Sequence, residues 1–300
     1  DGTNSVLGHL ARSALWDRKD EKIEQKAVEI LQVLVRAGAK LQACDEKILF
    51  YPISSGWVLF TELLLKNGAN PTRLIDGWTP MEIAVKYGQA NIVELLRKYG
   101  VPALEKRIAA QLGFIAAAGD RNIPQMEEAI RNGARVDEKN RQGETALINA
   151  VSSPLSFIKS YDTYATIQYL LEKGADPKVL GEGRYGKTTA LHRAIGNSSF
   201  IFDKEIKKEI KKDEFKDSPL YARLIIQSLL QNGALVSARD SDGMTPLHIA
   251  AKYNNIVGAT MLIKAGSKIM PRDDKGKTPL DYAESADMIK VLKDHGAKEE

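Results

Sequence analysis

Several features on which catalysis or membrane insertion depends are scarce in this sequence of 300 residues. Its one cysteine, Cys44, permits neither an internal disulfide nor a zinc site built from thiolates. No apolar run approaches the roughly eighteen residues that a membrane-spanning helix requires; the runs are short, such as residues 57–60. These absences predict a soluble protein without membrane insertion.

An excess of one charge is also missing, because 43 Lys and Arg residues stand against 39 Asp and Glu residues, for a net charge of +4. So small an excess gives little support to nucleic-acid binding, and we expect no nucleic-acid partner. The first residue, Asp1, is compatible with a trimmed chain or with removal of a signal peptide. A periplasmic or exported location and a cytoplasmic one therefore both stay open.

What the sequence does contain is a repeat. A Gly followed by a small residue recurs after leucine-rich segments, and a second marker, Gly-x-Thr, precedes several of these glycines. The first marker occurs at Gly38, Gly68, Gly100, Gly133, Gly174, Gly233, Gly266 and Gly296, and the second begins at Gly77, Gly143, Gly243 and Gly276, with a variant at Gly186. The two markers are 23 residues apart in the third and seventh units but 31 and 47 apart in the fifth and sixth. The fifth and sixth units therefore carry insertions of about 8 and 24 residues.

The segment Thr245-Pro246-Leu247-His248-Ile249-Ala250-Ala251, followed by Ala265-Gly266, resembles the signature turn and paired helices of the ankyrin repeat. The resemblance, with weaker copies over nearly the whole chain, implies an all-α solenoid of stacked helix-turn-helix units with short β-turn or hairpin connections. We predict a single ankyrin-repeat domain over residues 1–300, in which the first, second and fourth units lack the Gly-x-Thr marker. The predicted units are 3–44, 45–75, 76–108, 109–140, 141–180, 181–238, 239–271 and 272–300, with insertions near 152–162 and 197–218.

The residues of the marker explain why a turn and a helix start together. Gly243 permits positive φ, Thr245 can cap the helix, and Pro246 is tolerated at the first helical position. One such unit cannot bury its apolar face alone, so stacking on neighbours is what stabilises it, and each unit contacts mainly the next. The resemblance further implies that His192 and His248 tie adjacent turns together through hydrogen bonds.

The strongest chemical motif is Gly181–Thr188, which formally matches both the P-loop and the dinucleotide GxGxxG patterns. A P-loop needs a buried strand before it, and only Val179 and Leu180 are available as an apolar lead-in. Nucleotide binding at Lys187 therefore stays an alternative function, and we expect no cofactor.

Other chemical readings are weaker. The sequence 240–243 resembles part of a calcium loop, but Ile249 stands where the loop needs a glutamate. The four histidines are spread along the chain and predict no metal site, and Cys44 has no histidine near it in sequence. The alternating charges of residues 203–217, with Ile206 and Ile210 four apart, predict a solvated added helix.

The predicted function is therefore protein binding without enzymatic activity, by a chain that is monomeric when free. Ankyrin proteins bind partners along a concave face, through the turn tips and the first-helix positions that follow the Ala-Ala pair, and some bacterial members resemble inhibitors or self-protection partners of hydrolases. Carried over by repeat register, the resemblance implies a binding row of sixteen residues. They are Arg73, Trp78, Lys86, Tyr87, Lys139, Arg141, Glu144, Arg184, Tyr185, Lys187, Arg239, Met244, Lys252, Tyr253, Arg272 and Lys275.

Overall fold

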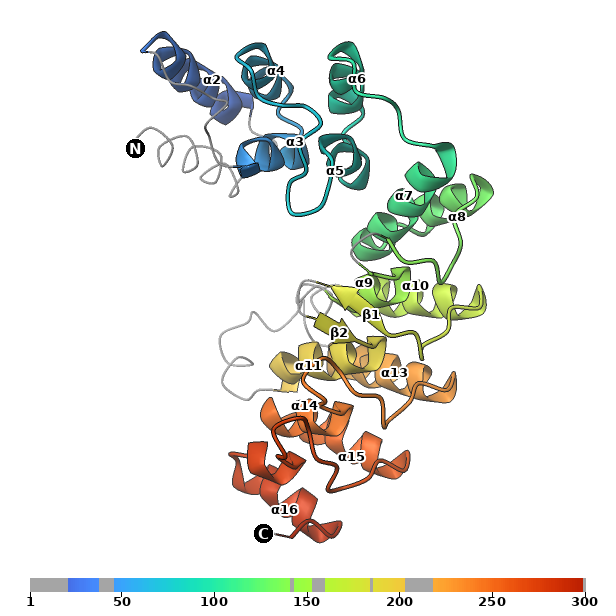
Figure 1. Cartoon of the computed structure of the whole chain (residues 1–300). Helices are drawn as coiled ribbons and strands as arrows, with labels where there is room; N and C mark the ends of the chain where they lie inside the picture. Colours follow the sequence, from blue (N-terminus) through green and yellow to red (C-terminus); the bar gives the residue numbers. More distant parts are fainter. Residues whose placement is uncertain are drawn as a thin grey trace. The chain divides into compact units, whose positions relative to one another are not determined.

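The computed structural model describes residues 21–37, 46–140, 143–152, 160–183, 186–202 and 218–298 (Figure 1). Within these ranges the chain forms stacked helix pairs joined by short turns and hairpins, which confirms the predicted fold class. It divides into two compact units, Asp1–Gly113 and Phe114–Glu300. Each unit is described by itself, and the helix α7 (Lys106–Asp120) crosses their boundary.

The first unit contains two layers of helices. The helix α3 packs on α5 in one layer, while α2, α4 and α6 follow one another in the second layer. Its core includes the fully buried Leu31, Ile53, Phe60, Leu64 and Ile92. The elements are α2 (Glu21–Arg36), η3 (Glu46–Leu49), α3 (Phe50–Ser55), α4 (Val58–Lys66), α5 (Pro80–Lys86) and α6 (Ala90–Lys98).

The turn before α5 shows why the Gly-x-Thr marker starts a helix. Ile75 and Trp78 pair as a β-bridge around Asp76 and Gly77, which both have positive φ, 50° and 82°. Two central residues with positive φ form the tight hairpin turn that Asp-Gly favours. The Thr79 hydroxyl then accepts a hydrogen bond from the backbone N–H of Glu82, and the Glu82 carboxylate accepts one from the N–H of Thr79. This reciprocal capping box begins the helix.

The second unit repeats the two-layer arrangement. First helices α9, α11, α14 and η5 stack in one layer, and second helices α10, α13, α15 and α16 stack in the other. Ala150, Ala194 and Ala250 are completely buried in the first layer, where a small side chain lets neighbouring helices approach closely. The elements are α8 (Ile123–Arg131), α9 (Ala146–Ser152), α10 (Ser160–Glu172), β1 (Gly181–Gly183), β2 (Gly186–Thr188), α11 (Ala190–Phe202), α13 (Ser218–Gln231), α14 (Pro246–Lys252), α15 (Ile256–Lys264), η5 (Pro279–Tyr282) and α16 (Ala286–Asp294).

Both predicted insertions fall between the two helices of their repeats. The first lies between α9 and α10 and the second between α11 and α13. Part of the second continues the first helix, because α11 has 13 residues where α9 and α14 have 7 each. The charged segment 203–217, for which we predicted an added helix, lies outside the described residues, as does Cys44.

In the described part of the chain, no helix is both long and apolar enough to cross a membrane. The same residues contain no group of three or more His, Cys, Asp or Glu side chains that could hold a metal ion.

Candidate functional site

We call the turns that carry the Gly-x-Thr markers tips, and the seventh and eighth tips are each built around an inward-facing carboxylate. In the seventh tip, residues 240–245, the Asp240 Oδ1 accepts the backbone N–H groups of Asp242 and Met244, each at 2.9 Å. Asp273 does the same in the eighth tip, residues 273–278, for the N–H groups of Lys275 and Lys277, also at 2.9 Å. These aspartates therefore serve as turn-forming residues.

The Oδ2 of Asp273 also accepts a hydrogen bond from the Tyr282 hydroxyl at 2.5 Å. Burial raises the pKa of the Asp273 carboxyl, but the hydrogen bonds from Tyr282, Lys277 and Lys275 outweigh burial and hold that pKa below its usual value. The same contact raises the pKa of Tyr282 to about 12. The eighth tip is thus closed around an ionised, largely buried carboxylate.

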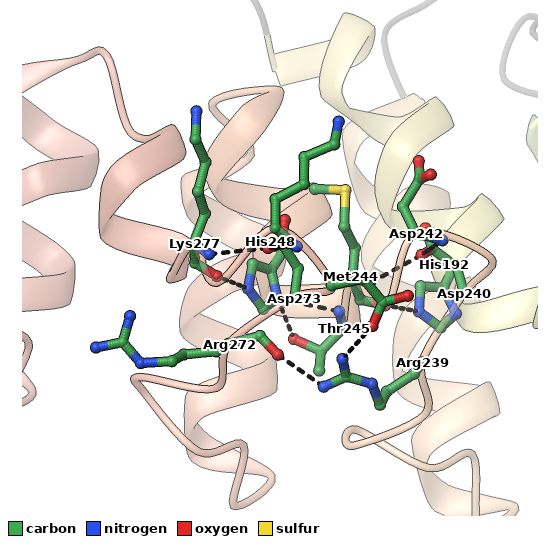
Figure 2. Close-up of polar contacts among 12 residues, drawn as sticks. His192, Arg239, Asp240, Asp242, Met244, Thr245, His248, Arg272, Asp273 and Lys277 are labelled. Carbon is green, nitrogen blue, oxygen red and sulfur yellow. Dashed lines mark hydrogen bonds and ion pairs between the residues drawn. The ribbon is translucent and has the colours of Figure 1, made fainter.

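His192 connects the sixth tip to the seventh, and His248 connects the seventh tip to the eighth (Figure 2). His248 Nδ1 accepts the backbone N–H of Thr245 at 3.0 Å, so its other ring nitrogen, Nε2, carries the proton and donates to the Lys277 carbonyl at 3.0 Å. His192 repeats the pattern with Thr189 and with the Met244 carbonyl, at 3.4 and 3.1 Å. The predicted role of both histidines is confirmed.

The environment of these rings keeps them neutral. Burial lowers the pKa of His192 and of His248, although a carbonyl hydrogen bond and nearby carboxylates oppose the shift. A proton added at Nδ1 would also meet the Thr N–H donor. The neutral imidazole, with the proton on Nε2, is therefore the form that joins the tips.

Backbone hydrogen bonds also connect successive tips. The N–H of Glu182 donates to the Gly143 carbonyl at 2.9 Å. The N–H of Ser241 donates to the Lys187 carbonyl at 3.1 Å, and the N–H of Asp274 to the Asp242 carbonyl at 3.1 Å. We call this series the tip ladder. It places the fifth to eighth tips of the second unit in fixed register.

Arg239 reinforces the ladder between the last two tips. Its Nη1 donates to the Arg272 carbonyl at 2.7 Å, and its Nη2 lies 2.8 Å from the Asp274 carboxylate (Figure 2). Arg272 in turn donates to the Gly276 carbonyl at 2.6 Å. Guanidinium groups, which remain charged and present several donors, therefore hold the backbone of the eighth tip from outside.

The opposite edge of the second unit, where each first helix turns into its second, is tied in the same way by amides. Asn149 donates to the Ile115 carbonyl at 2.7 Å, Asn197 to the Val151 carbonyl at 2.6 Å, and Asn255 to the Ile195 carbonyl at 2.9 Å. In the described part of the first unit, Gln89 donates to the Ser54 carbonyl in the same way. Both edges of the second unit are thus cross-linked between repeats.

The glycine-rich segment has hairpin geometry. Its ends form an antiparallel pair with Gly181 opposite Thr188, Glu182 opposite Lys187 and Gly183 opposite Gly186. The Lys187 ammonium lies 3.4 Å from the Glu182 carboxylate across that pair. A P-loop wraps its backbone N–H groups around phosphate, whereas these residues pair with each other and with neighbouring tips.

The predicted binding row is mostly exposed, with exceptions. Arg73, Tyr87, Lys139, Lys187, Arg239, Lys252, Tyr253, Arg272 and Lys275 are exposed, Lys86 and Glu144 are half-buried, and Arg141, Arg184 and Tyr185 lie outside the described residues. Trp78 and Met244 are buried, with 7% and 3% of their surface exposed. These two side chains belong to the repeat core, which corrects their place in the predicted row.

The reason for this correction lies in the slot that Trp78 and Met244 occupy, one residue before the capping threonine. Lys277, in the same slot of the eighth tip, is exposed. The slot lies at the margin of the stack, so an apolar side chain folds onto the core while a charged one extends into solvent. Trp78 is covered in part by Lys86, whose ammonium lies 4.3 Å from the ring centroid.

A second exposed group, which the predicted binding row does not include, lies at the start of two second helices. Tyr161 of α10 packs edge-on against Tyr221 of α13 at 5.6 Å between ring centroids, and Tyr164 lies 5.8 Å from Tyr221. Tyr161 is 62% exposed and the adjoining Leu220 is 53% exposed. Their helical positions carry no repeat marker, so only the packing of α10 on α13 reveals the group.

Comparison with known proteins agrees with the repeat architecture. A family model described as Ankyrin repeats (3 copies) matches residues 22–106 and 217–300. Two Fowlpox virus (strain NVSL) proteins named as ankyrin repeat proteins are similar to the chain. FPV022 is 26% identical over 264 residues, which cover 81% of this chain and 40% of the viral protein, and FPV244 is 30% identical over 115 residues, which cover 38% and 16%. The chain thus spans less than half the length of either relative.

Proposed function

Since the chain belongs to the ankyrin-repeat family, whose repeats generally mediate protein–protein interaction, we propose that it binds another protein through the exposed tips and first-helix ends of its repeats. We call these residues the tip row. In the second unit the described, exposed members are Lys139, Lys187, Arg239, Lys252, Tyr253, Arg272 and Lys275, and in the first unit they are Arg73 and Tyr87.

The observation that carries this proposal is the tip ladder. Because backbone bonds and histidines fix successive tips in register, a partner meets a surface that pays little ordering entropy on binding. Tyr87 and Tyr253 are 38% and 47% exposed, and tyrosine and arginine are the residue types that dominate interface energetics. The Lys252 ammonium, 5.6 Å from the Tyr253 ring centroid, adds a cation at the same place.

The decisive test compares two tyrosine substitutions in the second unit. A pull-down from the native lysate with wild type, Tyr253→Ala and Tyr161→Ala should retain a partner with wild type and Tyr161→Ala but lose it with Tyr253→Ala. Tyr161 is a matched control because it is also an exposed tyrosine, placed on a second helix. Loss with Tyr161→Ala alone would move the binding site to the insertion-bearing edge and overturn the tip-row proposal.

The narrower hypothesis is that the bound partner is a hydrolase which the chain inhibits. It motivates an activity assay of the retained protein with increasing amounts of chain. Stoichiometric loss of hydrolysis by wild type, but not by Tyr253→Ala, is the expected result. Unchanged hydrolysis at saturating chain would reject inhibition while leaving binding intact.

The nucleotide alternative needs Lys187 to contact phosphate. The hairpin pairing of Gly181–Thr188 and the ion pair with Glu182 speak against it. It predicts that ATP with magnesium raises the midpoint of thermal unfolding and that Lys187→Ala abolishes the rise. We expect no rise with either protein.

A further inference from the structure

The seventh and eighth tips, with the arginine that precedes each, look electrically neutral in sequence. They contain four acidic and four basic residues. The acids are Asp240, Asp242, Asp273 and Asp274, and the bases are Arg239, Arg272, Lys275 and Lys277. What a partner meets depends on which of these groups the fold itself uses.

The fold uses most of the acids. Asp240 and Asp273 turn inward and accept two backbone N–H groups each, and Asp273 is only 5% exposed. The converging N–H dipoles offset the negative charge of each carboxylate. Asp274 is paired with Arg239 at 2.8 Å. The Asp242 side chain is exposed, while its backbone carbonyl accepts the N–H of Asp274 in the tip ladder.

The bases are placed differently. Lys275 and Lys277 contribute to the eighth tip through their backbone N–H groups, while their side chains are exposed. The Lys277 ammonium lies 5.3 Å from the Tyr282 ring centroid, which holds it near the tip surface. Arg272 is exposed and donates to the Gly276 carbonyl. Hydrogen bonds from Thr278, and then the charges of Arg272 and Lys277, lower the pKa of the Asp281 carboxyl. Figure 2 shows the side chains of Arg272 and Lys277 extending away from the network of buried bonds.

We propose that the seventh and eighth tips form a cationic docking surface, made by Arg272, Lys275 and Lys277, for an acidic, carboxylate-bearing segment of the partner protein. The inference rests on the proposed function and specifies the partner's chemistry. Carboxylates suit this surface because the exposed ammonium groups of Lys275 and Lys277 stand two residues apart, next to the positive charge of Arg272. Complementary charge of this kind sets specificity and the rate of encounter more than raw affinity.

The test selects partners by chemistry. A library of displayed peptides of random sequence is panned on the full chain, on Lys275→Glu/Lys277→Glu, and on Lys264→Glu/Lys290→Glu. The last variant is the matched control, because it changes the same charge at exposed lysines of the second helices α15 and α16. Wild type and the control should enrich Asp and Glu above the input library, and the tip variant should not.

The best wild-type peptide is then measured by fluorescence anisotropy. We expect its Kd to rise about tenfold with Lys275→Glu/Lys277→Glu, by less with Lys275→Gln/Lys277→Gln, and little with the control variant. Raising salt from about 50 to about 300 mM should weaken the wild-type complex, because exposed charges are screened. Circular dichroism checks that each variant keeps its helices.

Three outcomes would overturn the inference. Selected peptides without acidic enrichment that still compete at Tyr253 would reject the acidic partner but keep the proposed function. Peptides unaffected by any tip-row variant would reject both. Binding of a mixed-sequence single-stranded RNA through Lys275 and Lys277, with no acidic peptides selected, would assign the surface to nucleic acid instead.

Discussion

The third repeat, in the first unit, and the seventh, in the second, begin comparable helices with different side chains three residues after the capping threonine. In the third repeat, the Glu82 carboxylate accepts hydrogen bonds from the backbone N–H and the hydroxyl of Thr79. In the seventh repeat, His248 bonds Thr245 with one ring nitrogen and reaches the next tip with the other. An imidazole has two nitrogens on opposite sides of a rigid ring, so it can cap its own helix and hold a neighbour at once.

The residue in the capping box correlates with whether the next repeat has a Gly-x-Thr tip. The repeat after Glu82 lacks a Gly-x-Thr tip, whereas the repeats after His192 and His248 have one. The fifth repeat is an exception, since Ile148 stands in the same position and a backbone bond from Glu182 to Gly143 joins its tip to the next. The residue at this position thus reports whether side-chain coupling between tips is in use.

The largest effect is expected from removing the two-sided side chain. His248→Ala should lower the free energy of unfolding by about 2–4 kcal/mol, because a buried cap and a buried carbonyl lose their partner together. Glu82→Ala should lower the free energy of unfolding by about 1–2 kcal/mol through the loss of its cap. Urea unfolding gives both values.

Hydrogen exchange with mass spectrometry then separates local from coupled loss. Faster exchange in both the seventh and eighth tips of His248→Ala, against the third tip only in Glu82→Ala, is the expected pattern. If His248→Ala accelerates exchange in its own tip alone, the ring does not couple the repeats.

A second, smaller effect is a pH dependence of the free energy of unfolding, which the capping boxes with histidine should cause. The folded pKa of His192 and of His248 lies below the ordinary value of 6.5, so the unfolded chain binds more protons below that pH. The free energy of unfolding should therefore be greatest above about pH 6.5 and fall as the pH drops, by at most about 1.4 kcal/mol per pH unit for each histidine. Urea unfolding from about pH 7.5 to about pH 5 measures the slope.

The double variant His192→Gln/His248→Gln should flatten that slope. Exchange in residues 76–86, whose box contains no histidine, provides the internal control and should not follow the same pH dependence. An unchanged slope in the double variant would mean that other groups bind the protons.

The smallest effect concerns the exposed ion pairs. Arg239→Ala should lower the free energy of unfolding by less than about 1 kcal/mol, because its contact with Asp274 is solvent-exposed. Lys187→Ala, which loses the 3.4 Å contact with Glu182 inside one hairpin, should change the free energy of unfolding less. A larger loss for Lys187 than for Arg239 would contradict the view that bridging between tips matters more than pairing within one.

Much of this architecture can be predicted from sequence because it is carried by residues at a fixed period. In the repeats that have the marker, the capping threonines and the bridging histidines follow from the Gly-x-Thr register. Trp78 and Met244 could not be placed so easily, since their slot accepts both buried and exposed side chains and residue type decides the outcome.

The bonds at the opposite edge escaped sequence reasoning for a different reason. Asn149 and Asn197 lie within first helices at different distances from their capping threonines, while Asn255 caps a second helix. All three side chains bond the backbone of the preceding repeat, but from three different positions within the repeat, so no periodic sequence signal marks them. The cationic surface of the last two tips is also hidden in the sequence, because formal charge does not show which carboxylates face inward.

The direction of the tip ladder bears on how such a chain can grow. In the seventh repeat, the Ser241 N–H donates to the tip before it, and the Asp242 carbonyl accepts from the tip after it. His248 donates to the following tip, and Asn255 donates to the first helix of the preceding repeat. The tip bonds and the histidine bond have counterparts in the sixth repeat. A copy of this segment inserted beside itself would repeat those bonds, so gene duplication could lengthen the tip ladder by whole repeats.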